Sequence, residues 1–285
     1  MSEPMVFLNG ELVPRSRAQV SVRNPSFRHG EGIFETLRGR GERAFRTQCH
    51  LDRLRASAAA LRWRLPWPTA ELQQALGTAL RANALSESRV RIHASPGASD
   101  GSACEPVLLV EVEPFVAVPE EVRRAGVALQ LWPYRRSRQG GILSRAKTAS
   151  YLENLLARRA AREDGAHDAL FVTDEGLVSE TACANVFAVL HGKMRTPPLE
   201  GGVLAGVTRQ VVLETGAAGA REETLTLEDL HAADEIFITS TGVEILPVIS
   251  VDGARVGKGV PGPVAREVGL LYRRVLDDEL PSVAG

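Results

Sequence analysis

Residues 143–154 have the sequence Leu-Ser-Arg-Ala-Lys-Thr-Ala-Ser-Tyr-Leu-Glu-Asn, which places Lys147 in a short polar turn, four residues before an apolar helix expected to begin at Tyr151. A turn at the boundary of an element lets a rigid scaffold direct a side chain into a cleft. Only three of the chain's 34 cationic residues are lysines. Lysine, unlike arginine, can lose its proton and act as an amine nucleophile. Taken alone, however, the segment fits a solvated loop lysine better.

Length and composition set the class of protein. A chain of 285 residues with 44% hydrophobic content can bury a sizeable core, and two domains are expected. The net charge of −1 provides no field that would attract nucleic acid or a membrane surface. Cys49, Cys104 and Cys183 are far apart and form neither a disulfide framework nor a Cys-x-x-Cys metal site. No apolar run approaches transmembrane length. We therefore expect a cytoplasmic protein.

A break in the hydrophobic pattern divides the chain into two parts. We place a linker at residues 119–126, between a small domain at 1–118 and a larger domain at 127–285. In the first domain strands and helices segregate, which is typical of the α+β class. The strands expected there lie at residues 5–13 (a hairpin), 19–22, 33–38, 44–46, 89–94 and 106–116, and the helices at 50–61 and 71–85.

Three patterns in the first domain carry further expectations. Gly30 and Gly32 precede the strand at 33–38 and indicate that backbone passes close to another segment there. The apolar run at 106–116 shows little alternation and predicts a strand buried on both faces. The strand at 89–94 alternates instead, with Arg91 on its polar face.

Four features of the second half make chemical sense together. Lys147 offers an amine, and Glu180 offers a carboxylate just past the end of a strand expected at 177–179. Gly206, Val207 and Thr208 open a helix, where backbone N–H groups bind anions. The segment 240–242 follows another strand with two hydroxyls and a glycine. Amine, carboxylate and anion site are the three groups needed to hold pyridoxal phosphate (PLP). Each is weak alone, because such a glutamate is usually solvated and such a turn usually only caps a helix.

At these residues the sequence resembles the class IV, or fold type IV, family of PLP-dependent aminotransferases and lyases. The resemblance covers nearly the whole chain. It rests on six ordered motifs: Gly30-x-Gly32-x-Phe34-Glu35-Thr36-x-Arg38; His50-Leu51-Asp52-Arg53-Leu54; Lys147-x3-Tyr151-Leu152-x-Asn154; Ser179-Glu180-x4-Asn185-Val186-Phe187; Gly206-Val207-Thr208-Arg209; and Thr239-Ser240-Thr241-x2-Glu244-Ile245-x-Pro247-Val248. It implies a small α+β domain, a larger domain with a β-barrel-like core, and a homodimer.

The resemblance also implies a role for each matching residue. Lys147 would form the Schiff base with PLP and shuttle the substrate's α-proton, and Glu180 would hydrogen-bond the pyridine nitrogen. An anionic Glu180 would favour the protonated ring, because a close opposite charge shifts a pKa by about 1–3 units. The remaining cofactor contacts would come from Arg46 at the phosphate, Tyr151, Leu204 against the ring, Gly206, Val207, Thr208, Ser240 and Thr241.

The substrate residues are less sharply defined. Arg38 and Arg91 are candidates for the substrate carboxylate, because arginine binds carboxylates with a two-pronged fork. A structural ion pair is an equally good explanation of Arg38. By resemblance, Phe34, His29 and Gly242 complete the substrate site.

The family contains several activities, and the motifs divide among them. The Phe34 and Arg91 motifs and the Lys147–Tyr151 spacing look like some aminodeoxychorismate lyases, whereas residues 251–264 look like branched-chain aminotransferases. The carboxylate clamp of D-amino-acid aminotransferases is absent from its expected place at residues 101–105. His29 stands where branched-chain enzymes have a tyrosine. We favour an aminotransferase with a branched-chain-like donor, and keep a 4-amino-4-deoxychorismate lyase and a D-amino-acid or R-amine transaminase as alternatives. The partners expected are an amino acid and a 2-oxo acid.

Overall fold

The computed structural model describes residues 3–97, 104–137 and 146–281. The chain separates into two compact units, one of Met1–Val116 with Ala146–Tyr151 and Leu276–Gly285, the other of Ala117–Arg145 with Leu152–Val275. The first unit therefore takes in the segment around Lys147 and the C-terminal residues. The segment expected as a linker contains a short helix, α4 (Glu120–Ala125), which belongs to the second unit.

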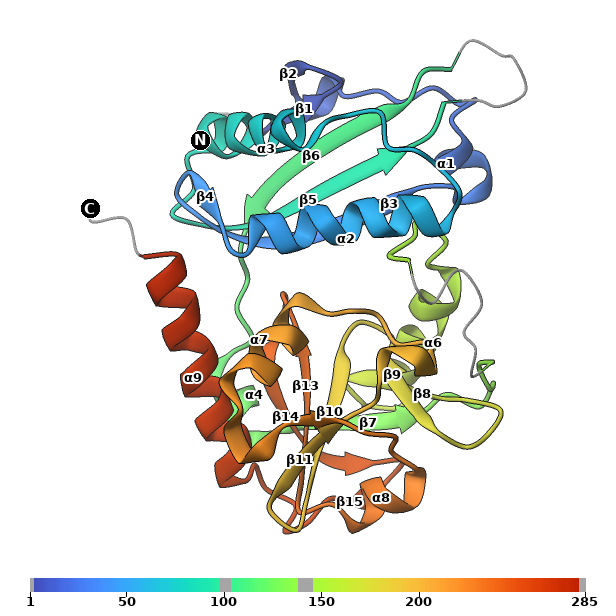
Figure 1. Ribbon diagram of the computed structural model, residues 1–285, viewed down its shortest axis with the longest axis vertical. Helices are drawn as coiled ribbons and strands as arrows, with labels where there is room; N and C mark the ends of the chain where they lie inside the picture. The colour runs from blue at the N-terminus through green and yellow to red at the C-terminus, as the bar shows by residue number, and fades with distance from the viewer. Residues whose placement is uncertain (1–2, 98–103, 138–145, 282–285) are drawn as a thin grey trace. The chain divides into compact units, whose positions relative to one another are not determined.

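The first unit is a sheet with two long helices (Figure 1). Its described strands pair in the order β2-β1-β6-β5-β3-β4, and all pairs are antiparallel. The elements are β1 (Met5–Leu8), β2 (Glu11–Pro14), α1 (Pro25–His29), β3 (Ile33–Arg40), β4 (Arg43–Ala44), α2 (Thr47–Ala60), α3 (Thr69–Asn83), β5 (Glu87–Ser95) and β6 (Val107–Pro114). Segregated helices and strands confirm the α+β class for this unit.

The core of the first unit lies between the sheet and helices α2 and α3. Leu51, Leu54 and Ala58 of α2 recur at helical spacing and are 0–1% exposed. They pack in one cluster with alternate residues of β5 and β6, such as Ile92 and Val110. The expectation for β6 was wrong, because its residues alternate between buried and half-buried and only one face enters the core. The strand expected at residues 19–22 is also absent, since that exposed segment pairs with no strand among the described residues.

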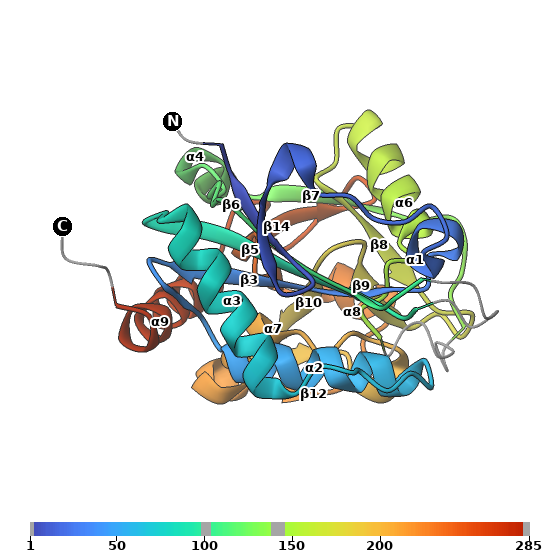
Figure 2. The same cartoon turned by 90° about the horizontal axis from the view of Figure 1, so that it is seen from above.

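The second unit is built on a curled sheet (Figures 1 and 2). Its described strands follow the order β12-β11-β10-β13-β14-β7-β8-β9, with β15 paired to β14. The elements are β7 (Val127–Leu131), α6 (Leu152–Glu163), β8 (Asp168–Val172), β9 (Val178–Thr181), β10 (Asn185–Leu190), β11 (Lys193–Thr196), α7 (Val207–Thr215), β12 (Arg221–Glu222), α8 (Leu227–Ala232), β13 (Glu235–Ser240), β14 (Glu244–Val251), β15 (Ala254–Arg255) and α9 (Pro263–Glu279). Curling agrees with the barrel-like core expected for this part of the chain.

Topology gathers several strand ends in the second unit. Strand β10 begins at Asn185, directly opposite Thr239 near the end of β13. Helix α7 contacts β13, and β9 contacts β10. The carboxylate of β9, the start of α7 and the turn after β13 are therefore neighbours within this unit.

Candidate functional site

The backbone of Lys147 is held on both sides. Its N–H donates to Ser57 Oγ of α2 at 3.0 Å, and its carbonyl accepts from the Phe34 N–H of β3 at 2.9 Å. Thr148 forms an isolated antiparallel bridge with Ile33, and the Ala149 N–H donates to the Gly32 carbonyl at 2.7 Å. The segment thus pairs with the first residues of β3. The short strand β4 pairs only with the other end of β3. A loop fixed to a strand in this way aims its lysine from a rigid base.

The two glycines before β3 allow this approach, as the sequence predicts. A Cβ at Gly30 would lie 2.9 Å from Ser150 Oγ and 3.2 Å from Ser150 Cα, and Gly30 has a left-handed φ of 71°. A Cβ at Gly32 would collide with Ser26 Oγ and touch Ala149. Backbone that passes this close requires residues without side chains.

Phe34 is the centre of an aromatic and cationic cluster. Lys147 Nζ lies 4.5 Å from the centroid of its ring, and the Tyr151 ring meets it edge-on at 5.6 Å. On the neighbouring strand, His93 stacks on Phe34 at 5.8 Å and the Arg91 guanidinium is also 5.8 Å away. Burial, and then the charge of Arg91, lower the pKa of His93 to about 4, so this imidazole is neutral at pH 7. The structure therefore brings together four candidates predicted from the sequence: Phe34, Arg91, Lys147 and Tyr151.

A buried ionic network lies at the next position of β3. Glu35 is 0% exposed, and both its oxygens accept hydrogen bonds from Arg53, at 2.8 and 2.6 Å. His50 Nδ1 is 2.7 Å from the same carboxylate. Burial raises the pKa of Glu35, but Arg53 and His50 outweigh burial and bring it down to about 2. Burial lowers the pKa of His50 against the opposing effect of Glu35, and the charge of Lys147 adds to the lowering.

Three further candidates of the first unit have other surroundings. Arg46 precedes α2 in a left-handed conformation and pairs with Glu279, with Nε 2.7 Å and Nη2 2.6 Å from its oxygens. Arg38 is 2.7 Å from Glu87 and stacks on Phe115 at 3.2 Å. The pair with Glu87 is the structural ion pair that was one of the two explanations of Arg38 from the sequence. His29 ends α1 and is exposed.

In the second unit, Glu180 accepts hydrogen bonds from neutral donors. Its Oε2 accepts from the Leu204 N–H at 3.1 Å and from Asn185 Nδ2 at 3.2 Å, and Asn185 also donates to the Leu204 carbonyl at 2.9 Å. Arg136 Nη1 lies 3.9 Å from Oε1. The expectation that Glu180 lies past a strand was wrong, because pairing of Thr181 with Leu170 extends β9 through it.

Helix α7 begins at the residues where an anion site is expected. Gly206 is the N-cap of this helix, and the side chains of Val207 and Thr208 are buried behind it. A Cβ at Gly206 would collide with Asn185 Oδ1, so the glycine allows the helix start to approach the residues that hold Glu180. Strand β13 ends at Ser240 and is followed by Thr241 and exposed Gly242. Beside them, Thr239 Oγ1 is buried without a hydrogen-bond partner in the described part of the chain. A buried hydroxyl without a partner among the described residues, in a strand that contacts α7, fits an oxyanion at the helix start.

Sequence analysis missed three residues of these arrangements. Ser57 lies on the inner face of α2, and Asn185 stands within a family motif but received no role. Arg136 contacts Glu180, Asn154 and Glu153 and stacks on Phe171. Only Asn185 had a usable signal, since a polar residue opens an otherwise apolar strand there. Residues 98–103, which include part of the expected clamp position, and 138–145 before Lys147 lie outside the described residues.

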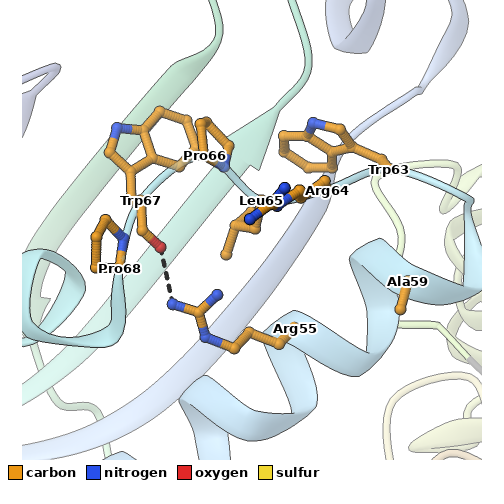
Figure 3. Close-up of a pocket in the computed structure, with 8 residues that line it drawn as sticks. All are labelled: Arg55, Ala59, Trp63, Arg64, Leu65, Pro66, Trp67 and Pro68. Carbon is orange, nitrogen blue, oxygen red and sulfur yellow. Dashed lines mark hydrogen bonds between the residues drawn. The ribbon is translucent and has the colours of Figure 1, made fainter.

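Other features of the described residues do not resemble a catalytic site. A cavity of about 570 Å³ lies at the turn between α2 and α3, where Arg55 donates to the Trp67 carbonyl at 2.8 Å (Figure 3). Its lining, all from residues 55–68, includes none of the candidates. No group of three or more metal-ligating side chains occurs in the part of the chain that the structure describes. Within the same ranges, no helix combines the length and apolar character needed to cross a membrane.

Comparison with known proteins decides the family. Residues 32–251 match the family model described as Amino-transferase class IV. The chain belongs to the class IV aminotransferase family. It is 30% identical over 271 residues to a putative branched-chain-amino-acid aminotransferase of Methanocaldococcus jannaschii, covering 92% of this chain and 93% of that protein.

Solved structures agree with the family and the fold. The branched-chain aminotransferase of Escherichia coli superposes with a TM-score of 0.89 at 28% identity, covering 100% of this chain and 98% of that one. A hypothetical aminotransferase of Mycobacterium tuberculosis in its PLP-bound form gives a TM-score of 0.85 at 27% identity, with 96% of this chain and 99% of that one covered. This class IV aminotransferase therefore has fold type IV and is an enzyme.

Proposed function

We propose that this class IV aminotransferase uses PLP to transfer an amino group from a branched-chain amino acid to a 2-oxo acid. The observation that carries the proposal is the match to branched-chain enzymes over nearly the whole chain, combined with a lysine whose backbone is pinned to β3 and α2. The structural relative from Mycobacterium tuberculosis is bound to PLP, which supports the cofactor.

The residues present fit PLP. The start of α7 at Gly206, with Val207 and Thr208, would receive the phosphate, and Thr239, Ser240 and Thr241, at the end of a strand that contacts α7, would add hydroxyls. Arg46 would supply a cation to that phosphate, in competition with the carboxylate of Glu279 that it binds in this structure. Leu204 would pack against the ring while its N–H holds Glu180.

The side chains of this protein then have distinct tasks. When bound, PLP supplies an aldehyde for amines and a ring that withdraws electrons from the substrate α-carbon. Glu180, held as an acceptor by Asn185 and Leu204, would keep the ring nitrogen protonated. The amine of Lys147 would hold the cofactor and then carry the proton of the substrate α-carbon. The Phe34 ring lies beside that amine, and Tyr151 packs against Phe34.

Substrate selection follows from the surroundings of Phe34. The ring offers an apolar surface for a branched side chain, and neutral His93 stacked on it adds no charge at pH 7. Arg91 is the candidate for a carboxylate, since its guanidinium borders the same ring and the side chain is exposed. His29 and Gly242 complete the proposed substrate residues. Arg38 has a lesser claim, because Glu87 already occupies one side of its guanidinium.

A donor panel tests the function directly. The protein loaded with PLP is incubated with 2-oxoglutarate and either L-leucine, D-alanine or an aromatic amine, and separately with 4-amino-4-deoxychorismate, and the products are separated by chromatography. We expect glutamate and the oxo acid of leucine. Release of pyruvate from 4-amino-4-deoxychorismate, with no reaction of the amino donors, would establish the lyase instead. A preference for D-alanine or the amine would overturn the branched-chain assignment alone.

Assembly and location are further parts of the proposal. Leu152, Leu155 and Leu156 of α6 are 69%, 51% and 44% exposed, and a second copy of the chain would cover such an apolar face. A homodimer is therefore proposed. The three cysteines are not joined in disulfides, which suits the reducing cytoplasm.

A further inference from the structure

We propose that Ser57 is a positioning residue for Lys147, acting through the hydrogen bond from the lysine's backbone N–H to the serine hydroxyl. This inference rests on the proposed role of Lys147 as the residue that holds the cofactor. Ser57 would not touch cofactor or substrate itself. It would set where the lysine amine stands by fixing the backbone from which that side chain extends.

The location of Ser57 makes this hydroxyl unusual. It lies in the last turn of α2 and is 0% exposed, on the helix face that also carries His50, Arg53 and Leu54 at spacings of seven, four and three residues. Helices favour alanine, and the next position, Ala58, is a buried alanine. Burying a hydroxyl without a partner is costly. The partner here comes from a segment 90 positions away in the chain, which makes the contact specific to the fold.

The hydrogen bond completes a two-sided clamp. The Phe34 N–H holds the Lys147 carbonyl from β3, and Ser57 holds the Lys147 N–H from α2. With both peptide groups fixed, the φ and ψ of Lys147 cannot change independently of the two elements. Loss of Ser57 removes the hydrogen bond from α2 to the N–H of Lys147, and a small rotation about φ becomes a large displacement at the end of a four-carbon side chain. The Phe34 ring, 4.5 Å from Nζ, provides only a loose contact by comparison.

A matched pair of serine substitutions tests the inference. Ser57→Ala removes the acceptor with minimal change in volume, and the alanine suits a helix. Ser88→Ala is the control, because Ser88 is equally buried in the same unit and its hydroxyl has no hydrogen-bond partner among the described residues. Ser57→Thr keeps the hydroxyl and is the conservative rescue. All variants are made in the full chain, with and without PLP.

Three measurements report on position rather than on folding. Hydrogen exchange of the Lys147 amide in the cofactor-free protein should speed up about 5- to 10-fold in Ser57→Ala, as expected for loss of one hydrogen bond. In the loaded protein, kcat should fall about 10- to 100-fold with KM changed by less than about 3-fold, because misplacement acts on the reacting geometry. The pH at which the visible absorption band of the lysine-linked cofactor changes should shift as well. Ser88→Ala should leave all three unchanged.

Each outcome bears on one claim. If the wild-type protein neither binds PLP nor transaminates, the proposed function fails, while amide exchange still reports on the clamp. If the wild-type protein is active and Ser57→Ala matches Ser88→Ala in exchange and kcat, the positioning role is overturned. Should Ser57→Ala fail to fold, rapid exchange of the Lys147 amide in the wild-type protein would overturn it equally. Recovery of kcat by Ser57→Thr supports it.

Discussion

Glu35 in the first unit and Asp168 in the second are equally buried carboxylates, 0% and 1% exposed, yet their pKa values move in opposite directions. Burial raises the pKa in both cases. In Glu35, Arg53 and His50 lie within hydrogen-bond distance and reverse the effect, so the pKa falls to about 2. Asp168 accepts from Thr181 Oγ1 and from backbone N–H groups, with Arg158 4.0 Å away, and its pKa remains raised. A cation in direct contact, rather than the number of donors, decides the sign.

The same contrast separates the two sets of candidate residues. In the first unit, Lys147 stands beside a network of buried formal charges, and Arg46 and Arg38 are each paired with a carboxylate. In the second unit, Glu180 and the start of α7 depend on backbone N–H groups, an amide side chain and a glycine. Removing one member of a buried charge network leaves an uncompensated charge, which costs much stability. Substituting a residue that is held by neutral donors leaves only uncharged groups without a partner, which costs less. Substitutions within the buried charge network around Glu35 should therefore affect folding more, and those at Glu180 should affect mainly chemistry.

The largest effect is expected from Lys147→Arg. Arginine keeps the positive charge and the backbone clamp, but its guanidinium cannot lose the proton that amine chemistry requires. We expect transamination to fall by at least about 10³-fold, with the thermal unfolding midpoint changed little. Steady-state kinetics and calorimetry measure the two. Lys193→Arg, at an exposed lysine of the second unit, is the control and should change neither. Retention of activity in Lys147→Arg would remove this lysine from the mechanism.

The next effect compares the two carboxylates directly. Glu35→Gln leaves Arg53, whose side chain is 11% exposed, and the buried His50 beside a neutral amide, so the free energy of unfolding should fall by about 3–5 kcal/mol. Asp168→Asn removes no close ion pair. It should lower the free energy of unfolding by about 1 kcal/mol, mainly because the new amide nitrogen would face a hydrogen-bond donor. Urea unfolding at pH 7 measures both. Equal losses in the two variants would show that burial alone, and not the contact with Arg53, governs these sites.

Sequence analysis predicted the elements of this fold better than their surroundings. Spacing located α2, α3 and α7 to within a few residues, because amphipathic periodicity and a Gly-x-Thr helix start are local signals. It could not find Ser57, because nothing in a helical sequence tells which buried serine meets a segment 90 residues away. For the same reason it assigned Arg46 a phosphate without detecting Glu279, and extended burial to both faces of β6. Long-range partners and the face that a strand exposes are properties of the packed chain.

A substitution in the second unit sharpens the contrast from the other side. Glu180→Gln keeps an acceptor for Leu204 and Asn185, and the Arg136 contact that it weakens spans 3.9 Å, so the unfolding free energy should change by about 1 kcal/mol or less. The ring nitrogen of the cofactor would lose its anionic partner, worth about 1–3 pKa units, and kcat should fall about 10- to 1,000-fold. Kinetics and the absorption spectrum of the bound cofactor test this. A collapse of stability without loss of kcat would reverse the division between the units.

The smallest effect concerns acid and two histidines, one in each unit. Burial lowers the pKa of both His93 and His167 to about 4, from an ordinary value of 6.5. Below pH 6.5 these imidazoles therefore bind protons in the unfolded chain but stay neutral in the folded chain. Stability is lost as the pH falls from 6.5 to 4. Glu35 acts in a separate window, between about pH 4.5 and 2, where its depressed pKa means that the folded chain binds fewer protons than the unfolded chain.

His93→Phe keeps the stack on Phe34 and should recover about 1–3 kcal/mol of the free energy of unfolding at pH 4 relative to pH 7. His167→Phe should recover a similar amount, because both imidazoles are half-buried and both pKa values are lowered to about 4. Urea unfolding at both pH values measures the two recoveries, and no recovery in either variant would show that these imidazoles do not limit stability in acid.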